Sequence, residues 1–452
     1  MSILSSMYAG ISGINANGAA ISIIGNNIAN VNTVGFKGSR AHFADVLTQS
    51  LSGASGRTQI GRGVILSDVS PTFSQGSFEV TSSGLDLGIE GDGFFLVRDN
   101  EESTYYTRAG QFSINSDGFV VNPEGYFLQG FQADTSGAVS GTIDDVDVSS
   151  TATPPNMTSG VVITANLDSR VSPIVTGFDE DDFSNTSHFS TAMTVYDSLG
   201  NGHLATVYFT KVYEDNAGGT GNYWQWNAVS DGLAGTDVMA MGYLQFDTGG
   251  ALVADDVADM DINPTSPRPL DVPPFPGLPA VMSDFDFDGG VTQNQVITFD
   301  FGASLTDGGS GLDGVTQFGS NSSTFFQNQD GYSSGSLKSI SINQDGIISG
   351  LYTNGQTRTL GQVVLGTFNN PHGLIKMGKN LYRESYDSGQ PIIGSPSSGG
   401  RGRLLSNSLE LSNVDLAEEF IKLITAQRGF QANSRVITTT DELLGELVNL
   451  KR

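Results

Sequence analysis

The two ends of this 452-residue chain carry apolar residues at helical spacing, and the long stretch between them does not. Near the N-terminus, apolar residues and glycines recur at alternating steps of three and four: Leu4, Met7, Ile11, Ile14, Gly18, Ile21, Gly25 and Ile28. This spacing predicts an amphipathic helix that ends within Asn30 to Thr33. Its internal glycines each cost about 1 kcal/mol relative to Ala. We therefore expect the segment to be helical only against a partner.

The C-terminus predicts a second and longer helix that begins near Asn413. Asp415 and Glu418 have capping-box spacing. One apolar seam consists of Leu416, Phe420, Leu423, Phe430, Ile437, Leu444 and Val448, and a second stripe of Val414, Ala417, Ile421 and Ile424. A helix with two stripes needs more than one neighbour. We therefore predict that the chain ends form a coiled-coil domain, with an ordinary two-helix hairpin of a globular domain as the alternative.

Between the ends, the sequence is typical of β structure. The pairs Asp117-Gly118, Asp345-Gly346 and Asn354-Gly355 stand between alternating apolar runs and predict hairpins. The segment FSINSDG (112–118) is echoed by SISINQDG (339–346), which suggests two halves of one β domain with an insertion between them. The predicted fold class is mainly β with α-helical termini: a coiled-coil domain of the terminal helices, with nested β-rich domains inserted between them.

This pattern divides the chain into four predicted parts. Residues 1–34 and 410–452 form the terminal coiled-coil domain, and the Gly- and Ser-rich residues 35–70 form an extended connecting loop. Residues 71–150 and 331–409 form a discontinuous β-rich domain. Residues 151–330 form an acidic β-rich domain of one or two subdomains. Seven prolines between 264 and 279 exclude a central strand there and predict a surface loop or subdomain link.

The negative charge is concentrated in the middle of the chain. Residues 141–330 hold 26 acidic and 3 basic residues, whereas residues 1–140 have a net charge of −6 and residues 331–452 of +2. Such a chain repels nucleic acids and anionic membranes. It has no apolar run long enough to span a bilayer, and its first residues lack the basic start of a secretory signal. We expect no nucleic-acid partner, no membrane span and no cleaved signal peptide.

The residue types also limit the chemistry. The chain has no Cys, which excludes disulfides, thiolate metal sites and a Cys nucleophile, and its four His are far apart in the sequence. Neither His203 nor His372 has a G-x-S-x-G nucleophile turn to serve. We expect no catalytic residue and no cofactor. A glycosidase, which needs only two carboxylates, stays open as an alternative.

One motif offers a weak metal candidate. Asp284, Asp286 and Asp288, followed by glycine, match the opening of a calcium loop. The twelfth position, which should be Glu, is Gln295. The acids also alternate with two phenylalanines, as in a half-buried strand. We therefore favour a strand, and keep a secreted acidic calcium-binding adhesin as an alternative.

Several segments together resemble a known family. They are ANVNTVGFKGSR (29–40), IEGDGFFLV (89–97), YTRAGQFSINSDGFVVNPEGYFLQGF (106–131), LGQVVLGTFNNPHGLIKMGKNLY (360–382) and SNVDLAEEFIKLITAQRGFQANSRVITTTDELL (412–444). They resemble the bacterial flagellar axial family of rod and hook proteins. TVYDSLGNGHLATVYF (194–209) resembles the outer domain of its hook branch. A distal rod-type axial protein is the alternative within the family.

The resemblance implies a structural subunit that self-assembles into a flexible helical tube, the hook, a universal joint that transmits torque from the motor and rod to the filament. The terminal helices would line the tube, with the β domains outside. The implied partners are copies of the same chain, the hook cap protein, the distal rod and hook–filament junction proteins, and the flagellar type III export apparatus, which delivers the subunit to the extracellular hook. The implied self-assembly residues are Leu4, Met7, Ile11, Ile14, Ile21, Ile28, Asn30, Asn32, Gly35, Phe36, Leu416, Phe420, Leu423, Phe430, Ile437, Leu444 and Val448.

Overall fold

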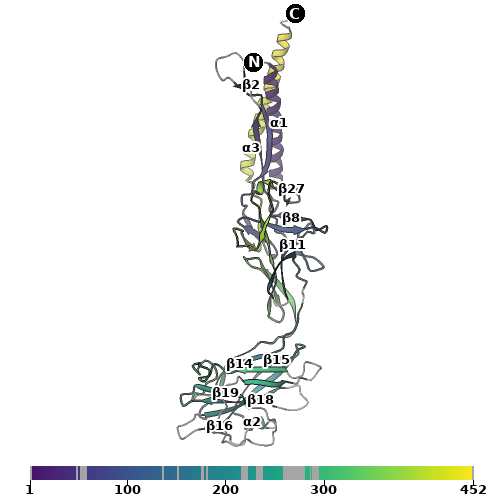
Figure 1. The fold of residues 1–452 in the computed structure, drawn as a ribbon. Helices are drawn as coiled ribbons and strands as arrows, with labels where there is room; N and C mark the ends of the chain where they lie inside the picture. Colours follow the sequence, from purple (N-terminus) through teal and green to yellow (C-terminus); the bar gives the residue numbers. More distant parts are fainter. Residues whose placement is uncertain are drawn as a thin grey trace. The chain divides into compact units, whose positions relative to one another are not determined.

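The computed structural model describes residues 3–46, 49–50, 59–134, 137–149, 152–174, 178–179, 182–214, 222–230, 238–257, 280–285, 287 and 295–449. The chain separates into two compact units (Figure 1). The first comprises Met1–Thr151, Leu337–Tyr352 and Gln356–Arg452, and the second comprises Ala152–Ser336 and Thr353–Gly355. The fold is mainly β with one long helix at each end of the chain, which confirms the predicted fold class.

The first unit contains both long helices and most of the short strands. Its N-terminal elements are α1 (Ile3–Ala29), β1 (Ser39–Asp45), β2 (Gln49–Ser50), β3 (Gln59–Ile60), β4 (Val64–Pro71), β5 (Phe78–Val80), β6 (Leu87–Glu90), β7 (Phe94–Arg98), β8 (Thr104–Thr107), β9 (Ser113–Ile114), β10 (Val120–Val121), β11 (Phe127–Ala133) and β12 (Val139–Asp145). Its C-terminal elements are β23 (Gly335–Ile342), whose first two residues belong to the second unit, β24 (Ile347–Tyr352), β25 (Thr357–Val363), β26 (Leu365–Thr367), η1 (Pro371–Gly373), β27 (Ile375–Gly378), β28 (Leu381–Arg383), β29 (Ile392–Gly394), β30 (Arg403–Ser406), β31 (Ser408–Glu410) and α3 (Leu416–Asn449).

The terminal helices α1 and α3 lie side by side and run antiparallel, so that both chain termini lie at the same end of the pair (Figure 1). The Asp415 carboxylate accepts hydrogen bonds from the amides of Ala417 and Glu418, at 2.8 and 3.3 Å, and so caps the start of α3. Both predicted helices are confirmed. Among the described residues, neither helix is long and apolar enough to cross a membrane.

The segment after α1 differs from the extended loop expected over residues 35–70. Strands β1 and β4 pair antiparallel from Ser39 opposite Pro71 to Asp45 opposite Val64. The pair lies against α1, where the Val64 amide donates to Ser12 Oγ at 3.2 Å. The Gly- and Ser-rich composition predicted a loop, but these backbone groups find hydrogen-bond partners in each other, which composition alone does not reveal.

Strand β7 lies at the centre of the β part of the first unit. The main sheet runs in the order β23-β24-β25-β11-β7-β8-β28-β27. Phe95 and Val97 of β7 pack into one hydrophobic cluster, whereas Phe94 and Leu96 pack into another. A strand that is covered on both faces reads as a continuous apolar run, and this accounts for the FFLV segment.

The hairpins share one turn with a sequence signature, in which Asn or Asp is followed three residues later by Gly. At Asn115 the side-chain Oδ1 accepts the amides of Asp117 and Phe119, at 3.0 and 2.9 Å, and Gly118 adopts φ +88°. Positive φ favours glycine. The same turn begins at Asn122, Asp134, Asp197, Asp247 and Asn343. The predicted hairpins at Gly118 and Gly346 are confirmed, and the echo between 112–118 and 339–346 is one turn used twice.

Two of these glycines allow backbone strain to be separated from crowding. We expect Gly125→Ala, at φ +87° in open space, to lower the unfolding free energy of the first unit by about 1–2 kcal/mol. Gly118→Ala should cost about 1–3 kcal/mol more, because the added methyl would lie 2.5 Å from Ser149 Cα. Urea denaturation of both variants tests this. Equal losses of unfolding free energy in the two variants would show that the backbone at Ser149 moves to make room for the added methyl.

The second unit is a β-sandwich. Its elements are β13 (Ala152–Thr153), β14 (Gly160–Asn166), α2 (Phe183–Thr186), β15 (Phe189–Tyr196), β16 (Gly202–Glu214), β17 (Asn222–Ser230), β18 (Val238–Phe246), β19 (Leu252–Val257), β20 (Ala280–Phe285), β21 (Gln295–Asp300) and β22 (Ser323–Gln329). The sheets β20-β21-β14-β22 and β15-β16-β17-β18-β19 enclose one core that includes Trp224, Trp226 and Phe299. The predicted loop at 264–279 lies outside the described residues.

His188 makes the stability of the second unit depend on pH. Its Nδ1 accepts the Lys211 amide at 3.0 Å and its Nε2 donates to the Ser172 carbonyl at 3.0 Å, so both nitrogens are satisfied in the neutral ring. Burial lowers the pKa of His188, and the charge of Lys211 lowers it further, against the opposing hydrogen bond to Ser172. The unfolded chain therefore binds this proton more tightly.

We expect the unfolding free energy of the second unit to fall as the pH drops below about 6.5, the ordinary His pKa, towards the lower folded value. Urea denaturation at pH 7.5 and 5.5 measures this effect. His188→Gln keeps an acceptor and a donor but does not titrate, so its stability should change less between the two pH values. Asp197 and Asp330, whose pKa values are also lowered, titrate below this range. An equal pH dependence in wild type and His188→Gln would contradict the prediction.

Candidate assembly interface

The helix pair of the first unit leaves an apolar face of α3 uncovered. The side of α3 that faces α1 buries Glu419 and Ala426. On the other side, Leu416, Phe420, Ile421 and Ile424 are 41, 49, 67 and 50% exposed. A single exposed apolar residue is ordinary, but four within nine residues of one helix form a patch typical of a protein–protein contact. We call these four residues the outward stripe.

The predicted seam of α3 is only partly covered within one chain. Leu423, Ile437 and Leu444 are half-buried, whereas Leu416, Phe420 and Phe430 are exposed. The side chain of Val448 lies outside the described residues. Val436 and Leu443 are also exposed and were not singled out in the sequence, because they stand outside the expected seam.

The predicted stripe of α1 also remains only partly covered. Met7, Ile14, Ile21 and Ile28 are half-buried, Ile11 is exposed, and the side chain of Leu4 lies outside the described residues. The positions that face α3 are shifted from that stripe and include Gly10, Gly13 and Asn27. Tyr8, which is 63% exposed, was missed because it lies off the stripe.

Of the predicted residues just beyond α1, Gly35 and Phe36 hold the helix to the β domain. Asn30 Nδ2 donates to the Asn26 carbonyl at 2.9 Å, and Asn32 is exposed. Gly35 has φ +67° and its amide donates to the Glu410 carbonyl at 2.7 Å. A Cβ on Gly35 would lie 2.5 Å from the Ala109 nitrogen, so only glycine fits. Phe36 is buried, with the Lys376 ammonium 5.5 Å from its ring centroid.

Three buried charges join both helices to the β domain; we call Lys37, Arg108 and Glu410 the root cluster. Lys37 Nζ lies 2.6 Å from Glu410 Oε1, and Arg108 Nη1 lies 3.2 Å from Oε2. The Lys37 and Glu410 side chains are fully buried and that of Arg108 is 4% exposed. Burial lowers the pKa of Lys37, against the opposing charge of Glu410, and burial likewise lowers the pKa of Arg108.

The root cluster fixes where each helix leaves the β domain. Lys37 follows α1, and Glu410 ends β31, shortly before α3. Glu410 Oε1 also accepts the Gly76 amide at 2.9 Å, and Lys37 Nζ donates to the Ser74 carbonyl at 2.8 Å. This cluster was not predicted from the sequence, because Glu410 lies 373 residues from Lys37 and 302 residues from Arg108.

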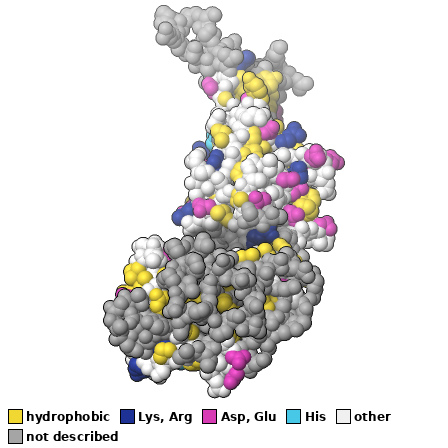
Figure 2. All heavy atoms as spheres, turned by 60° about the horizontal axis from the view of Figure 1, so that its bottom comes forward, with side chains coloured by type: hydrophobic (Ala, Val, Ile, Leu, Met, Phe, Trp, Pro, Cys, Tyr) yellow, Lys and Arg dark blue, Asp and Glu magenta, His cyan; other side chains and the backbone are white. Residues whose placement is uncertain are grey.

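The β1–β4 hairpin adds a second exposed apolar surface in the first unit. Phe43 and Leu66, which lie opposite each other in the pair, are 43 and 41% exposed, and Val69, opposite Ala41, is 41% exposed. Hydrophobic side chains reach the surface of the first unit between charged ones (Figure 2). These residues were missed because the segment was expected to be a loop.

The described residues contain no group of three acidic or His side chains that could hold a metal ion. The strand favoured for this motif is confirmed as far as Phe285, where β20 ends; Phe287 is not in a strand, and Asp286 and Asp288 lie outside the described residues. His203 lies 3.2 Å from Asp197 Oδ2 and stacks on Phe287, and His372 Nδ1 lies 3.0 Å from the Pro71 carbonyl.

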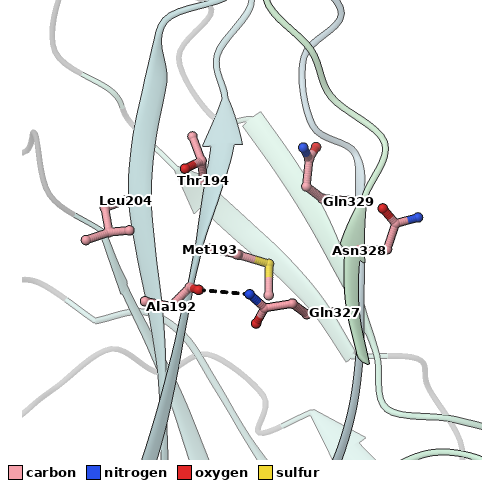
Figure 3. Close-up of a pocket in the computed structure, with 7 residues that line it drawn as sticks. All are labelled: Ala192, Met193, Thr194, Leu204, Gln327, Asn328 and Gln329. Atoms are coloured by element: carbon pink, nitrogen blue, oxygen red, sulfur yellow. Dashed lines mark hydrogen bonds between the residues drawn. The ribbon is translucent and has the colours of Figure 1, made fainter. Parts of the chain in front are cut away.

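A pocket of about 390 Å³ lies between β15 and β22 in the second unit (Figure 3). Gln327 bridges the two strands, with its Nε2 donating to the Ala192 carbonyl at 3.1 Å and its Oε1 accepting from Thr191 at 2.8 Å. The lining residues are Ala192, Met193, Thr194, Leu204, Gln327, Asn328 and Gln329. None of these side chains titrates, so this lining supplies no acid or base for catalysis.

Four family descriptions match successive segments of the chain. Residues 7–37 match "Flagella basal body rod protein", and residues 405–450 match "Flagellar basal body rod FlgEFG protein C-terminal". Residues 88–166 match "Flagellar hook protein FlgE/F/G D1 domain", and residues 166–332 match "Flagellar basal body protein FlaE D2 domain".

Three relatives that match over their full length carry the same name. The chain is 36% identical to the flagellar hook protein FlgE of Borreliella burgdorferi, over 99% of this chain and 100% of the relative. It is 33% identical to that of Treponema pallidum over 100% of both chains, and 31% identical to that of Escherichia coli over 98% of both. These full-length matches favour the hook branch over a distal rod protein. The three relatives are flagellar hook proteins, structural subunits of the bacterial flagellar hook. This chain belongs to the flagellar hook protein family.

Proposed function

We propose that copies of this chain polymerise into a helical tube in which the terminal helices of neighbouring subunits pack together along the inner wall. The outward stripe of α3 is the observation that carries the proposal, because α1 leaves it uncovered within one chain. The partly covered stripe of α1 and the apolar hairpin face supply further contact surface. The self-assembly residues predicted from the sequence belong to this interface or, like Gly35 and Phe36, hold it in place.

The remaining parts of the chain take their roles from this arrangement. We propose that residues 71–150 with 331–409 form a middle layer and that residues 151–330 form the outer layer. Copies joined head to tail, without closing a ring, build an open filament. The charge of −23 on residues 141–330 discourages tight lateral adhesion, which suits a tube that bends while it transmits torque. This is the role of a structural subunit rather than an enzyme.

Family membership supports the specific partners. These are the hook cap protein, the distal rod and hook–filament junction proteins, and the type III export apparatus, with export to the extracellular hook without signal cleavage. A start helix that needs α3 as its partner suits export as an unfolded chain.

Electron microscopy tests the proposed function. Concentrated purified chain should form tubes, and cells without the chain should keep their rods but lack hooks. Monomers at every concentration, together with intact hooks in those cells, would overturn the proposal. Loss of rods along with hooks would instead assign the chain to the distal rod.

A further inference from the structure

The two terminal helices contain the same five-residue pattern, and the structure places one copy against the other. Residues 13–17 read GINAN on α1, and residues 429–433 read GFQAN on α3. Each copy has Gly one helical turn before Asn, which puts the two residues on the same face of the helix. We call Gly13, Asn17, Gly429 and Asn433 the Gly–Asn clasp.

In the antiparallel pair, each asparagine lies on the glycine of the other helix. A methyl group added to Gly13 would lie 2.6 Å from Asn433 Nδ2, and one added to Gly429 would lie 2.8 Å from Asn17 Oδ1. The Asn17 amide is held in place, because its Nδ2 donates to the Gly13 carbonyl at 2.7 Å. The two halves therefore fill each other's gaps.

The clasp permits only one alignment of the two helices. A slip of one turn in one direction would bring Asn17 against Asn433, so that two amides would compete for one space. A slip in the other direction would bring Gly13 against Gly429 and leave a gap that no side chain fills. The observed register is also the one in which Asn27 Nδ2 reaches Glu419 Oε2, at 3.1 Å, at the other end of the pair.

We infer that the Gly–Asn clasp sets the register of α1 on α3 and thereby decides which apolar side chains of α3 face a second copy of the chain. The second part rests on the proposed function. A shifted α1 would cover a different part of α3 and change the exposure of the outward stripe. The clasp thus makes assembly specific by fixing which side chains of α3 are exposed. Its glycines and asparagines do not belong to the apolar seams predicted from the sequence.

Amide hydrogen exchange of α1 in the full-length monomer tests the clasp. Gly18 has no heavy atom within 4 Å of an added methyl, and Gly18→Ala is the matched control. We expect Gly18→Ala to raise protection of α1 about fivefold, through helix propensity. Gly13→Ala should lower protection about tenfold or more, through overpacking against Asn433.

In a second pair of variants, which carry Asn433→Ala, Gly13→Ala should change the protection of α1 in the opposite direction. In an Asn433→Ala background the obstacle is gone, so Gly13→Ala should raise protection as Gly18→Ala does. Three results would each overturn the clasp. Gly13→Ala could raise the protection of α1 in the wild-type background, it could change the protection in the same direction in both backgrounds, or α1 of the wild type could show no protection from exchange.

A polymerisation assay tests the second part of the inference. Tube formation should be impaired in Gly13→Ala and recovered in Gly13→Ala/Asn433→Ala. Unimpaired tubes from Gly13→Ala would overturn the link between register and assembly. If wild type forms no tubes at all, the proposed function fails, and the exchange data still decide whether the clasp exists.

Discussion

Replacing Glu410 with Gln should lower the unfolding free energy of the first unit by about 3–5 kcal/mol. The substitution keeps the shape of the side chain but removes the only negative charge of the root cluster. Lys37 and Arg108 would then be buried cations without a counter-charge in that cluster. The destabilisation should loosen the end of α1 and the start of α3 at once, because Glu410 contacts Lys37, which follows α1, and itself precedes α3. Urea denaturation, with helix content followed by circular dichroism, measures the effect.

The chain provides a matched control for this experiment. Glu90 pairs with Arg403 at 2.6 Å, but these side chains are 40 and 51% exposed. Glu90→Gln makes the same chemical change in a solvated pair and should alter the stability little. Adding Lys37→Met to Glu410→Gln removes one of the two orphaned cations and should recover part of the loss. Equal effects of Glu90→Gln and Glu410→Gln would contradict the assigned role of the root cluster.

The helices and hairpins could be predicted because their signals are local. A spacing of three and four residues identified both terminal helices, and Asp-Gly pairs identified turns, since each pattern reflects the geometry of neighbouring residues. The hairpin of β1 and β4 was missed because pairing between residues some 20–30 positions apart leaves no comparable signal in a Gly- and Ser-rich segment.

The contact between the two helices could not be predicted from apolar periodicity. The expected stripe of α1 passes through Ile11 and Ile14, yet the helices meet through Gly10 and Gly13, where the missing side chains allow a close approach. The root cluster gave no signal either: Lys37 and Glu410 lie 373 residues apart, and a lone charge in a sequence is normally expected on the surface. Buried polar pairs become visible only once the fold brings them together.

A charge placed on the outward stripe should separate assembly from folding. Ile421 is 67% exposed in the single chain, so Ile421→Glu should hardly change the stability of the monomer. In a polymer, the same position would lose the burial of an isoleucine, about 1.5–3 kcal/mol, and would bury an unpaired carboxylate. We expect the critical concentration for tube formation to rise more than 100-fold, measured by sedimentation of the polymer.

The same position provides the control. Ile421→Leu keeps the apolar surface and the helix propensity, so tubes should form near the wild-type concentration. The monomers of both variants should have the melting temperature of the wild-type monomer. Tubes from Ile421→Glu at the wild-type concentration would show that this face of α3 stays exposed to water in the polymer. Loss of tubes in both variants would indicate a contact that depends on the isoleucine shape rather than on burial. If Ile421→Glu impairs tube formation and Ile421→Leu does not, polymerisation depends on burying the outward stripe away from water.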